Sequence, residues 1–261
     1  MSTNLTVTRT EDITPVLRRV WFTSDDLSAF ADSDDTDRYV KLVFPKPGVV
    51  YPEPLDVRAL RGKIPPEDMP TVRTYTALFP DTETGTLAID FVVHGDDGVA
   101  GPWAAAAQPG DTLTVNGPGG GYRPDPTADW HLLAGDEAAL PAISAALAAL
   151  ADDAVARVAV LVESTDHEPE LVGPGEIRFL HRNAGDDLVE AVRAIDWLPG
   201  RVQAFVHGEA DAVMYGIRPY LLGERGLERA QVSISGYWRR GATEEGFRTW
   251  KSELAQAEGG R

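Results

Sequence analysis

The sequence predicts a β plus α/β fold, in which an N-terminal antiparallel Greek-key β-barrel is followed by a doubly wound parallel-sheet nucleotide-binding domain. Short segments rich in Val, Thr and aromatic residues fill the first half, and buried strand patterns alternate with helical patterns in the second half. A Gly- and Pro-rich stretch at 117–126 separates the two patterns. The 261 residues suffice for two hydrophobic cores, so we predict domains at 1–126 and 127–261, with the boundary at Pro126.

The barrel strands are expected to be short and separated by turn residues. We place them at residues 5–10, 16–23, 39–44, 73–79, 86–93 and 112–116. Residues 81–85 indicate a hairpin turn, and the seven prolines within 45–70 predict an irregular excursion between the third and fourth strands. A series of this kind without long helical patterns is typical of an antiparallel sheet closed into a barrel.

The second half switches to a different pattern. We expect its buried strands at residues 131–134, 157–162, 177–180, 202–207 and 232–235. Apolar residues recur at helical spacing over 140–150 and 188–195, and the amphipathic stretch 244–257 predicts a surface helix. This alternation predicts a parallel sheet whose ligand crevice lies beyond the carboxyl ends of its strands.

Composition restricts the partners of the protein. The formal net charge of −17 repels nucleic acid and anionic membranes, so we expect neither as a partner. No basic segment followed by an apolar stretch begins the chain, and the longest apolar segment, 140–151, is too short to span a bilayer. We therefore expect a soluble, cytoplasmic protein, and we expect it to be a monomer.

The absence of cysteine restricts the chemistry. Neither a disulfide nor a thiolate-ligated iron–sulfur cluster can form, so electron transfer would need an organic cofactor. The five histidines include no pair at the i, i+4 spacing of helical metal sites and no local carboxylate constellation. We expect no structural or catalytic metal.

The segment Arg73-Thr74-Tyr75-Thr76 combines a guanidinium, a phenol and two hydroxyls at the start of an apolar run. On an alternating strand, Arg73 and Tyr75 share one face, and Thr74 and Thr76 share the other. Arg supplies a fork of donors for a pyrophosphate, and Tyr supplies a π face for an isoalloxazine ring. The segment fits a flavin nucleotide, although an Arg and a Tyr on a strand are also common on a solvated sheet edge.

A second candidate segment follows about twenty residues later. The run 90–95, Asp-Phe-Val-Val-His-Gly, reads as a strand, and 98–104 reads as a Gly-rich loop that opens a short Ala-rich helix. Exposed backbone amides at a helix start bind anions without a charged side chain. The alternative is a loop that caps the helix, with Trp103 as its anchor in the core.

In the second half, Gly135-Asp136-Glu137 stands where the first strand passes to a helix, and Pro141 suits a first helical turn. The G-x-G-x-x-G fingerprint is absent there, so a plain βα turn is the alternative to a nucleotide site. Glu163 follows the next strand, where an acidic residue accepts from a ribose hydroxyl and disfavours a 2′-phosphate.

These motifs occur in an order that resembles the siderophore-interacting protein family, FAD-dependent ferric-siderophore reductases related to the ferredoxin reductases. The order is R-x-Y-T at 73–76, D-F-V-x-H-G at 90–95, G-x-A-x-x-W-A at 98–104 and Pro-Gly-Asp at 109–111. The likeness continues through 133–142, through Gly-Glu-Ala at 208–210 and through Gly-Tyr-Trp-Arg-Arg-Gly at 236–241, so it spans nearly the whole chain.

The resemblance implies two cofactors, FAD and either NADPH or NADH. The cofactor-binding residues that we carry over are Arg73, Thr74, Tyr75, Thr76, Asp90, Val92, His94, Gly98, Ala100, Gly101, Trp103, Ala104, Gly135, Asp136, Glu137, Glu163, Glu209 and Trp238. Relatives cover the flavin with an aromatic residue near the C-terminal end, for which Trp238 is our first choice and Tyr237 our second. The catalytic chemistry would belong to the flavin, so no catalytic side chain is assigned.

The chain departs from the family pattern at several positions of the two flavin-binding segments. Leu78 stands where members often carry a second Arg, and Val99, Gly101 and Pro102 stand where the loop often has Pro, Ser and a basic residue. The changes at Leu78, Gly101 and Pro102 remove polar or charged side chains.

The resemblance further implies a ferric siderophore as the substrate. Such chelates are commonly anionic, so a local basic patch has to overcome the acidic surface, and we expect it at Lys41, Lys46, Arg239 and Arg240. Two alternatives stay open. One is a general flavin reductase or electron-transfer flavoprotein with another acceptor, and the other is a redox-inactive binding module on the same fold.

Overall fold

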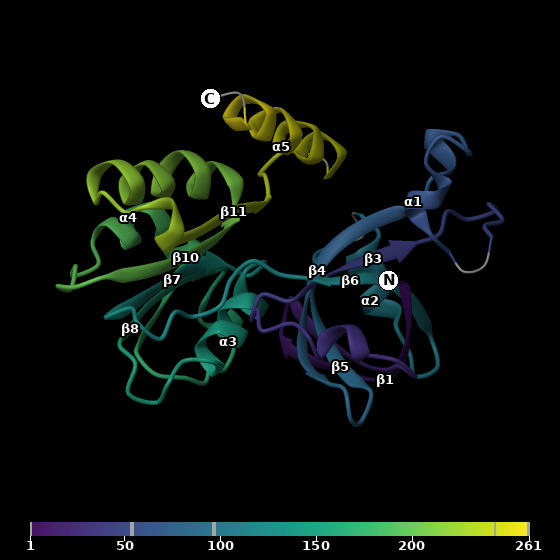
Figure 1. Ribbon diagram of the computed structural model, residues 1–261, viewed down its shortest axis with the longest axis horizontal. Coiled ribbons are helices and arrows are strands. Elements are labelled where there is room, and N and C mark those ends of the chain that lie inside the picture. Colours follow the sequence, from purple (N-terminus) through teal and green to yellow (C-terminus); the bar gives the residue numbers. More distant parts are fainter. Residues whose placement is uncertain (1, 53–54, 96–97, 243, 260–261) are drawn as a thin grey trace. The chain divides into compact units, whose positions relative to one another are not determined.

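The computed structural model describes residues 2–52, 55–95, 98–242 and 244–259 (Figure 1). Its chain contacts divide into two compact units. The first holds Met1–Arg123 together with Pro169–Leu171, and the second holds Pro124–Glu168 and Val172–Arg261. Each unit has its own sheet and its own core.

The first unit is a closed antiparallel barrel. Its strands are β1 (Ser2–Thr14), β2 (Leu17–Thr23), β3 (Tyr39–Phe44), β4 (Thr71–Asp81), β5 (Thr86–Val92) and β6 (Thr112–Gly119). They follow the order β1-β2-β5-β4-β3-β6, and the pairing of β1 with β6 closes the barrel. The predicted barrel is confirmed.

Large apolar side chains fill the barrel because alternate residues of each strand point inward. Phe22, Leu42, Ile89 and Phe91 are fully buried there. Helix α2 (Ala100–Ala106) packs against this core through its alanines, which leave room for the helix to lie close to the strands.

The connections of the barrel follow turn chemistry. Asp81 accepts hydrogen bonds from the backbone N–H groups of Glu83 and Thr84, and Gly85 has a φ of +66°, so the predicted β4–β5 hairpin turn is confirmed. Between β3 and β4 the described residues include α1 (Val57–Leu60) and the 3₁₀ turn η2 (Pro66–Asp68). A further 3₁₀ turn, η1 (Ser28–Phe30), follows β2.

The second unit is a parallel five-stranded sheet. Its strands are β7 (Trp130–Asp136), β8 (Ala156–Val162), β9 (Glu176–His181), β10 (Val202–Glu209) and β11 (Val232–Trp238). They follow the order β11-β10-β7-β8-β9. The chain therefore moves outward from β7 to β9 and returns to place β10 beside β7, which makes the β7–β10 boundary the topological switch point.

Helices cover both faces of this sheet, as Figure 1 shows for α3 (Leu140–Ala148) and α4 (Leu188–Arg193). Pro141 lies in the first turn of α3, as predicted, and Asp187 caps α4 by accepting from the N–H of Glu190. The two π-helical segments η5 (Ala212–Ile217) and η6 (Tyr220–Glu224) follow β10. Helix α5 (Glu244–Gly259) follows β11, where the sequence predicts a surface helix. The remaining short turns are η3 (Thr165–His167), η4 (Arg182–Ala184) and η7 (Arg229–Gln231).

In the part of the chain that the structure describes, no helix combines the length and the apolar character that a membrane crossing requires.

Candidate functional site

The R-x-Y-T segment lies on β4, in register with β3. Thr74 pairs with Lys41 and Thr76 pairs with Tyr39 across the two strands. Residues directly opposite one another in an antiparallel pair share a face, so the exposed side chains of Lys41 and Thr74 are neighbours. The sheet thus places a predicted substrate-binding lysine beside the predicted flavin segment.

Arg73 and Tyr75 share the opposite face of β4. They pair with Leu42 and Val40, which belong to the barrel core. Both side chains are half-buried, and the Arg73 guanidinium donates to the carbonyl of Val72 over 3.1 Å. The Tyr75 ring lies 4.7 Å from the ring of Phe91, so the barrel fixes its orientation.

Asp90 is buried in an ion pair with Arg19. The guanidinium donates from Nε and from a terminal nitrogen to the two carboxylate oxygens, over 2.6 and 2.8 Å. Asp90 is only 4% exposed, and its carboxylate pairs with a residue of the neighbouring strand β2. The sequence predicts that Asp90 binds the cofactor; in the structure its carboxylate pairs with Arg19 and so connects β5 with β2.

The 98–104 segment begins α2 at the end of β5. Val99 at the N-cap provides no side-chain acceptor, and within the described residues no other side chain is seen to cap the first turn. Gly98 has a φ of +80°, a backbone conformation that favours glycine. A Cβ at Gly101 would lie 3.3 Å from the carbonyl oxygen of Val92, so glycine lets the helix start close to the strand. His94 is exposed and Val92 is half-buried.

Trp103 is partly buried and packs against the core of the barrel. Its ring centroid lies 6.2, 6.1 and 5.7 Å from those of Phe22, Phe44 and Phe91. Contacts with three phenyl rings give Trp103 the role of an anchor for α2, which is the alternative that the sequence left open; its part in cofactor binding stays a prediction. Ala100 and Ala104 are buried, at 4% and 0% exposure.

In the second unit, predicted residues meet at the topological switch point. Asp136 ends β7 and Glu209 ends β10, and the N–H of Glu209 donates to Asp136 Oδ2 over 2.8 Å. Trp238, at the end of β11, donates from its indole Nε1 to the same oxygen over 2.8 Å, and the N–H of Ala138 donates to Oδ1 over 3.0 Å. Asp136 thereby connects the ends of three parallel strands.

The Asp136 carboxyl is 2% exposed. Its pKa is raised from 3.8 to about 6: burial is the largest cause and the nearby Glu137 adds to it, whereas the hydrogen bonds from Trp238, Glu209 and Ala138 act in the opposite direction. Gly208 makes this arrangement sterically feasible, because its φ is +143° and a Cβ there would lie 2.8 Å from Asp136 Oδ2. The sequence assigned Asp136 to the cofactor, but its oxygens are occupied by donors of the protein itself.

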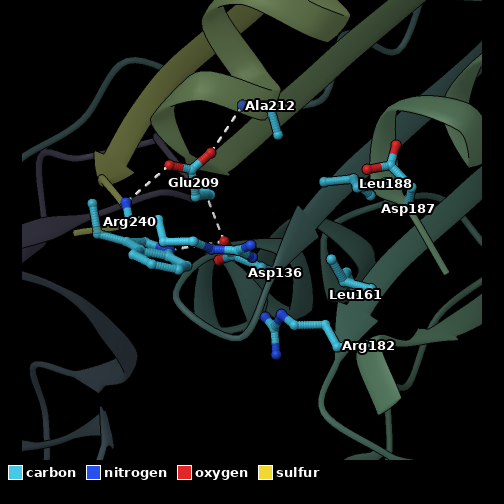
Figure 2. Close-up of a pocket in the computed structure, with 9 residues that line it drawn as sticks. Asp136, Leu161, Arg182, Asp187, Leu188, Glu209, Ala212 and Arg240 are labelled. Atoms are coloured by element: carbon cyan, nitrogen blue, oxygen red, sulfur yellow. Dashed lines mark hydrogen bonds between the residues drawn. The ribbon is translucent and has the colours of Figure 1, made fainter. Parts of the chain in front are cut away.

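Glu209 organises the next part of the chain. Its Oε2 accepts from the N–H of Ala212 at the start of η5 over 2.9 Å, and its Oε1 accepts from the N–H of Arg240 over 3.0 Å. Figure 2 shows these bonds around a small hollow of about 70 Å³. The hollow is lined by Asp136, Leu161, Arg182, Asp187, Leu188, Glu209, Ala212, Trp238 and Arg240. It lies where a doubly wound sheet binds its ligand, although it holds only a small part of a dinucleotide.

Glu137 pairs with Arg182, which follows β9. Arg182 donates from its two terminal nitrogens to the two oxygens of Glu137, one of them over 2.6 Å. The bond to Glu137 raises the pKa of Arg182. Glu163 lies 3.5 Å from the same guanidinium and is 54% exposed, so it is the more accessible of the two carboxylates.

Gly135 has a packing role. A Cβ at this position would lie 2.5 Å from the carbonyl oxygen of His207 and 2.6 Å from Cβ of Ala139. Glycine therefore lets β7 pass close to β10 and to the turn before α3.

The four predicted substrate residues lie in different surroundings. Lys41 is exposed on β3, Lys46 is exposed just after it, and the backbone of Arg240 is bound by Glu209. Arg239 is paired through Nε with Asp211, at 3.1 and 3.2 Å. Lys41 and Lys46 belong to the first unit, and the two arginines belong to the second.

A larger hollow of about 250 Å³ lies at the β1–β2 turn of the barrel, lined by residues such as Asp12, Arg18 and Val93. Among its described lining residues, Val93 lies in the 90–95 run, and none is a residue that the sequence analysis assigned to cofactor or substrate.

Sequence reasoning missed two arginines of these sites. Arg182 directly follows a predicted parallel strand, and that position alone marks it as a candidate for the crevice. Arg19 lies within a predicted strand, and no local signal indicates that its partner is Asp90, 71 residues away.

The barrel and the parallel sheet together define a ferredoxin reductase-like fold. The ferredoxin reductase of a carbazole 1,9a-dioxygenase has the same fold, with a TM-score of 0.68 at 15% identity over 91% of this chain and 70% of that chain. Residues 6–122 match the family described as the siderophore-interacting FAD-binding domain, and residues 128–241 match the siderophore-interacting protein family. The chain belongs to the siderophore-interacting protein family.

Three similar proteins match this chain over most of their own length. An uncharacterised protein of Mycobacterium tuberculosis is 47% identical, over 97% of this chain and 96% of that protein. The ferric vibriobactin reductase of Vibrio cholerae is 35% identical, over 88% of this chain and 87% of that protein. The crystal structure of a siderophore utilization protein from T. fusca has a TM-score of 0.79 at 38% identity, over 93% of this chain and 94% of that chain.

Proposed function

We propose that the chain is an FAD-dependent reductase that uses NADH or NADPH to reduce the iron of a ferric siderophore and so releases it as Fe(II). The observation that carries the proposal is the strand register, which sets Lys41 opposite Thr74 of the R-x-Y-T segment. A cation for an anionic chelate thus adjoins Thr74 of this segment, on the face of β4 opposite to Arg73 and Tyr75. The relative from Vibrio cholerae, a ferric vibriobactin reductase by name, supports the substrate class.

The residues of the first unit fit a flavin dinucleotide. Arg73 would donate to its pyrophosphate, and the backbone amides at the start of α2 would add donors that need no charged side chain. Tyr75, held against Phe91, would offer its phenol and part of its ring, and Thr76 would offer its hydroxyl. Leu78 is 1% exposed, so the position where relatives often carry a second Arg is part of the core here.

The second unit would bind a nicotinamide nucleotide with fewer of its predicted side chains in direct contact with the ligand. Asp136, Glu137 and Glu209 bind groups of the protein itself and would shape the crevice at the switch point. Glu163 would accept from ribose hydroxyls, which favours NADH. Trp238, held by Asp136, would present its indole near the end of β11.

The reaction balances without a catalytic side chain. Bound FAD would supply the exchange between a two-electron donor and a one-electron acceptor. Oxidation of one NADH or NADPH yields two Fe(II), the oxidised nicotinamide and a proton. Fe(II) binds hard oxygen ligands more weakly than Fe(III) does, so the reduced iron leaves the chelate. The protein's own residues bind, orient and shield the reactants.

The test is to measure FAD binding and ferric-chelate reduction by wild-type protein and Arg73→Ala. A charge-assisted hydrogen bond contributes about 1.5 to 3 kcal/mol, so FAD affinity should fall roughly tenfold to a hundredfold while the fold persists. Arg58→Ala, which removes an exposed arginine from the same unit, is the matched control and should bind FAD like wild type.

The outcomes separate the alternatives. Protein that stays colourless after incubation with FAD is a redox-inactive module, and the proposal fails. Protein that binds FAD and reduces free flavin or dyes, but no ferric chelate, is a general flavin reductase. Wild-type FAD affinity in Arg73→Ala would show that Arg73 is a structural strand residue.

A further inference from the structure

Helix α5 lies beyond residue 241, where the match to the siderophore-interacting protein family ends. It is nevertheless attached to β11 by specific contacts. Phe247 is 6% exposed, and its ring lies 3.7 Å from the position of a Cβ on Gly236. Lys251 donates from Nζ to Ser235 Oγ and to the carbonyl oxygen of Gly236, each over 3.0 Å.

This docking brings Trp250 against the arginine that follows β11. The Arg239 guanidinium carbon lies 5.2 Å from the centroid of the Trp250 ring, within cation–π range. The indole is held in turn, since its Nε1 donates to Tyr215 Oη over 3.2 Å and its ring stacks on Phe247 at 5.6 Å. Tyr215 lies on η5, so two elements fix the position of Trp250.

Asp211 holds the same arginine from the other side. Arg239 Nε lies 3.1 and 3.2 Å from the two carboxylate oxygens of Asp211. Among described residues, the hydrogen bonds of this guanidinium use Nε alone, which leaves the two terminal nitrogens for an acceptor from outside. The side chain is 34% exposed, so an incoming anion can reach it.

We infer that Trp250 is a positioning residue, through which α5 holds Arg239 with its terminal nitrogens turned to an anionic ferric chelate. The inference rests on the proposed function, since it assigns α5 a part in binding that substrate. A long arginine side chain loses rotamer freedom when it binds, and prior restraint by Trp250 and Asp211 lowers that cost. Trp250 should therefore affect the affinity for anionic chelates and leave electron transfer unchanged.

The test compares Trp250→Leu with Trp250→Phe. Leucine keeps apolar volume and removes the π face, whereas phenylalanine keeps a π face. Two simple probes differ in charge: the trianionic iron(III) tris(catecholate) and the neutral iron(III) tris(acetohydroxamate). For the trianionic probe, Trp250→Leu should raise the KM roughly threefold to tenfold with an unchanged kcat, because a partly exposed cation–π contact has about this strength. Trp250→Phe should stay within about twofold of wild type, and the neutral probe should respond to neither change.

A double-mutant cycle tests whether Trp250 acts through Arg239. In an Arg239→Gln background, Trp250→Leu should produce no further rise in KM for the trianionic probe. Equal rises with and without Arg239, a fall in kcat, or equal effects on both probes would overturn the inference. Circular dichroism would show whether α5 stays folded in each variant. If both Trp250→Leu and Trp250→Phe lost the helix, Trp250 would be a structural anchor of α5 and the inference would be overturned.

A binding measurement separates this inference from the proposed function. Calorimetric titration of oxidised, FAD-loaded protein with the trianionic probe needs no turnover. If wild type binds and reduces the probe while Trp250→Leu matches it, only the positioning role is rejected. If wild type neither binds nor reduces the probe, the proposed function fails and the inference is rejected with it.

Discussion

The buried carboxyl of Asp136 should make the stability of the protein depend on pH. Its pKa is raised from 3.8 to about 6, chiefly by burial. Between these two values the unfolded chain has lost the proton and the folded chain retains it, so the free energy of unfolding falls as pH rises. The contribution is fully present below about pH 4 and is lost by the time the pH has passed about 6.

The size of the effect follows from the shift. A change of about two pKa units corresponds to about 3 kcal/mol, at roughly 1.4 kcal/mol for each unit. Asp136→Asn removes the titration and keeps a similar shape. The free energy of unfolding of wild type, minus that of the variant, should therefore fall by about 3 kcal/mol between about pH 4 and about pH 7.

Urea denaturation of both proteins, followed by tryptophan fluorescence at a series of pH values, measures this difference. Subtraction removes the pH dependence of all other groups that the two proteins share. Asp152→Asn, which removes an exposed carboxylate from the same unit, controls for the change in formal charge. A difference between wild type and Asp136→Asn that is constant with pH, or that rises with pH, would refute the reasoning.

Three further perturbations test individual contacts, each by urea denaturation. Arg19→Met leaves the carboxylate of Asp90 buried without its partner and should lower the free energy of unfolding by about 3 kcal/mol. A second change, Asp90→Asn, should restore part of this loss. A loss below about 1 kcal/mol would mean that the pair is dispensable. Trp103→Ala should cost about 3 kcal/mol because the indole packs against three phenyl rings, and wild-type stability would contradict its anchoring role. Gly208→Ala should cost about 2 kcal/mol because its φ is +143° and the new Cβ meets Asp136; full tolerance would show that β10 can shift.

The positions of the strands were predictable because they depend on local patterns. Each of the eleven expected strands overlaps a strand of the structure, since alternating side chains and turn residues act over a few neighbouring positions. The two-part fold was also predictable, because strand runs and strand–helix alternation lead to different architectures. The resemblance of the ordered motifs to one family supplied the family itself, which the comparisons confirm.

The helical segments after β10 show where local reasoning fails. Gly216 lies within η5 and Pro219 precedes η6, and both residues disfavour a helix by propensity. In the structure a Cβ at Gly216 would lie 2.6 Å from the side chain of Val189, so glycine allows η5 to pack closely against α4. Tertiary packing outweighs propensity here.

The sequence by itself determined the kinds of residue available for the site: a guanidinium and a phenol on β4, carboxylates at the ends of parallel strands, and aromatics near the C-terminal end. Only the tertiary structure decided which of these groups the protein uses internally. Asp136 takes its indole donor from Trp238, 102 residues away, and Glu137 pairs with Arg182, 45 residues away. A buried carboxylate must find donors, and the fold determines which donors come within reach, because strand order joins segments that are distant in the chain.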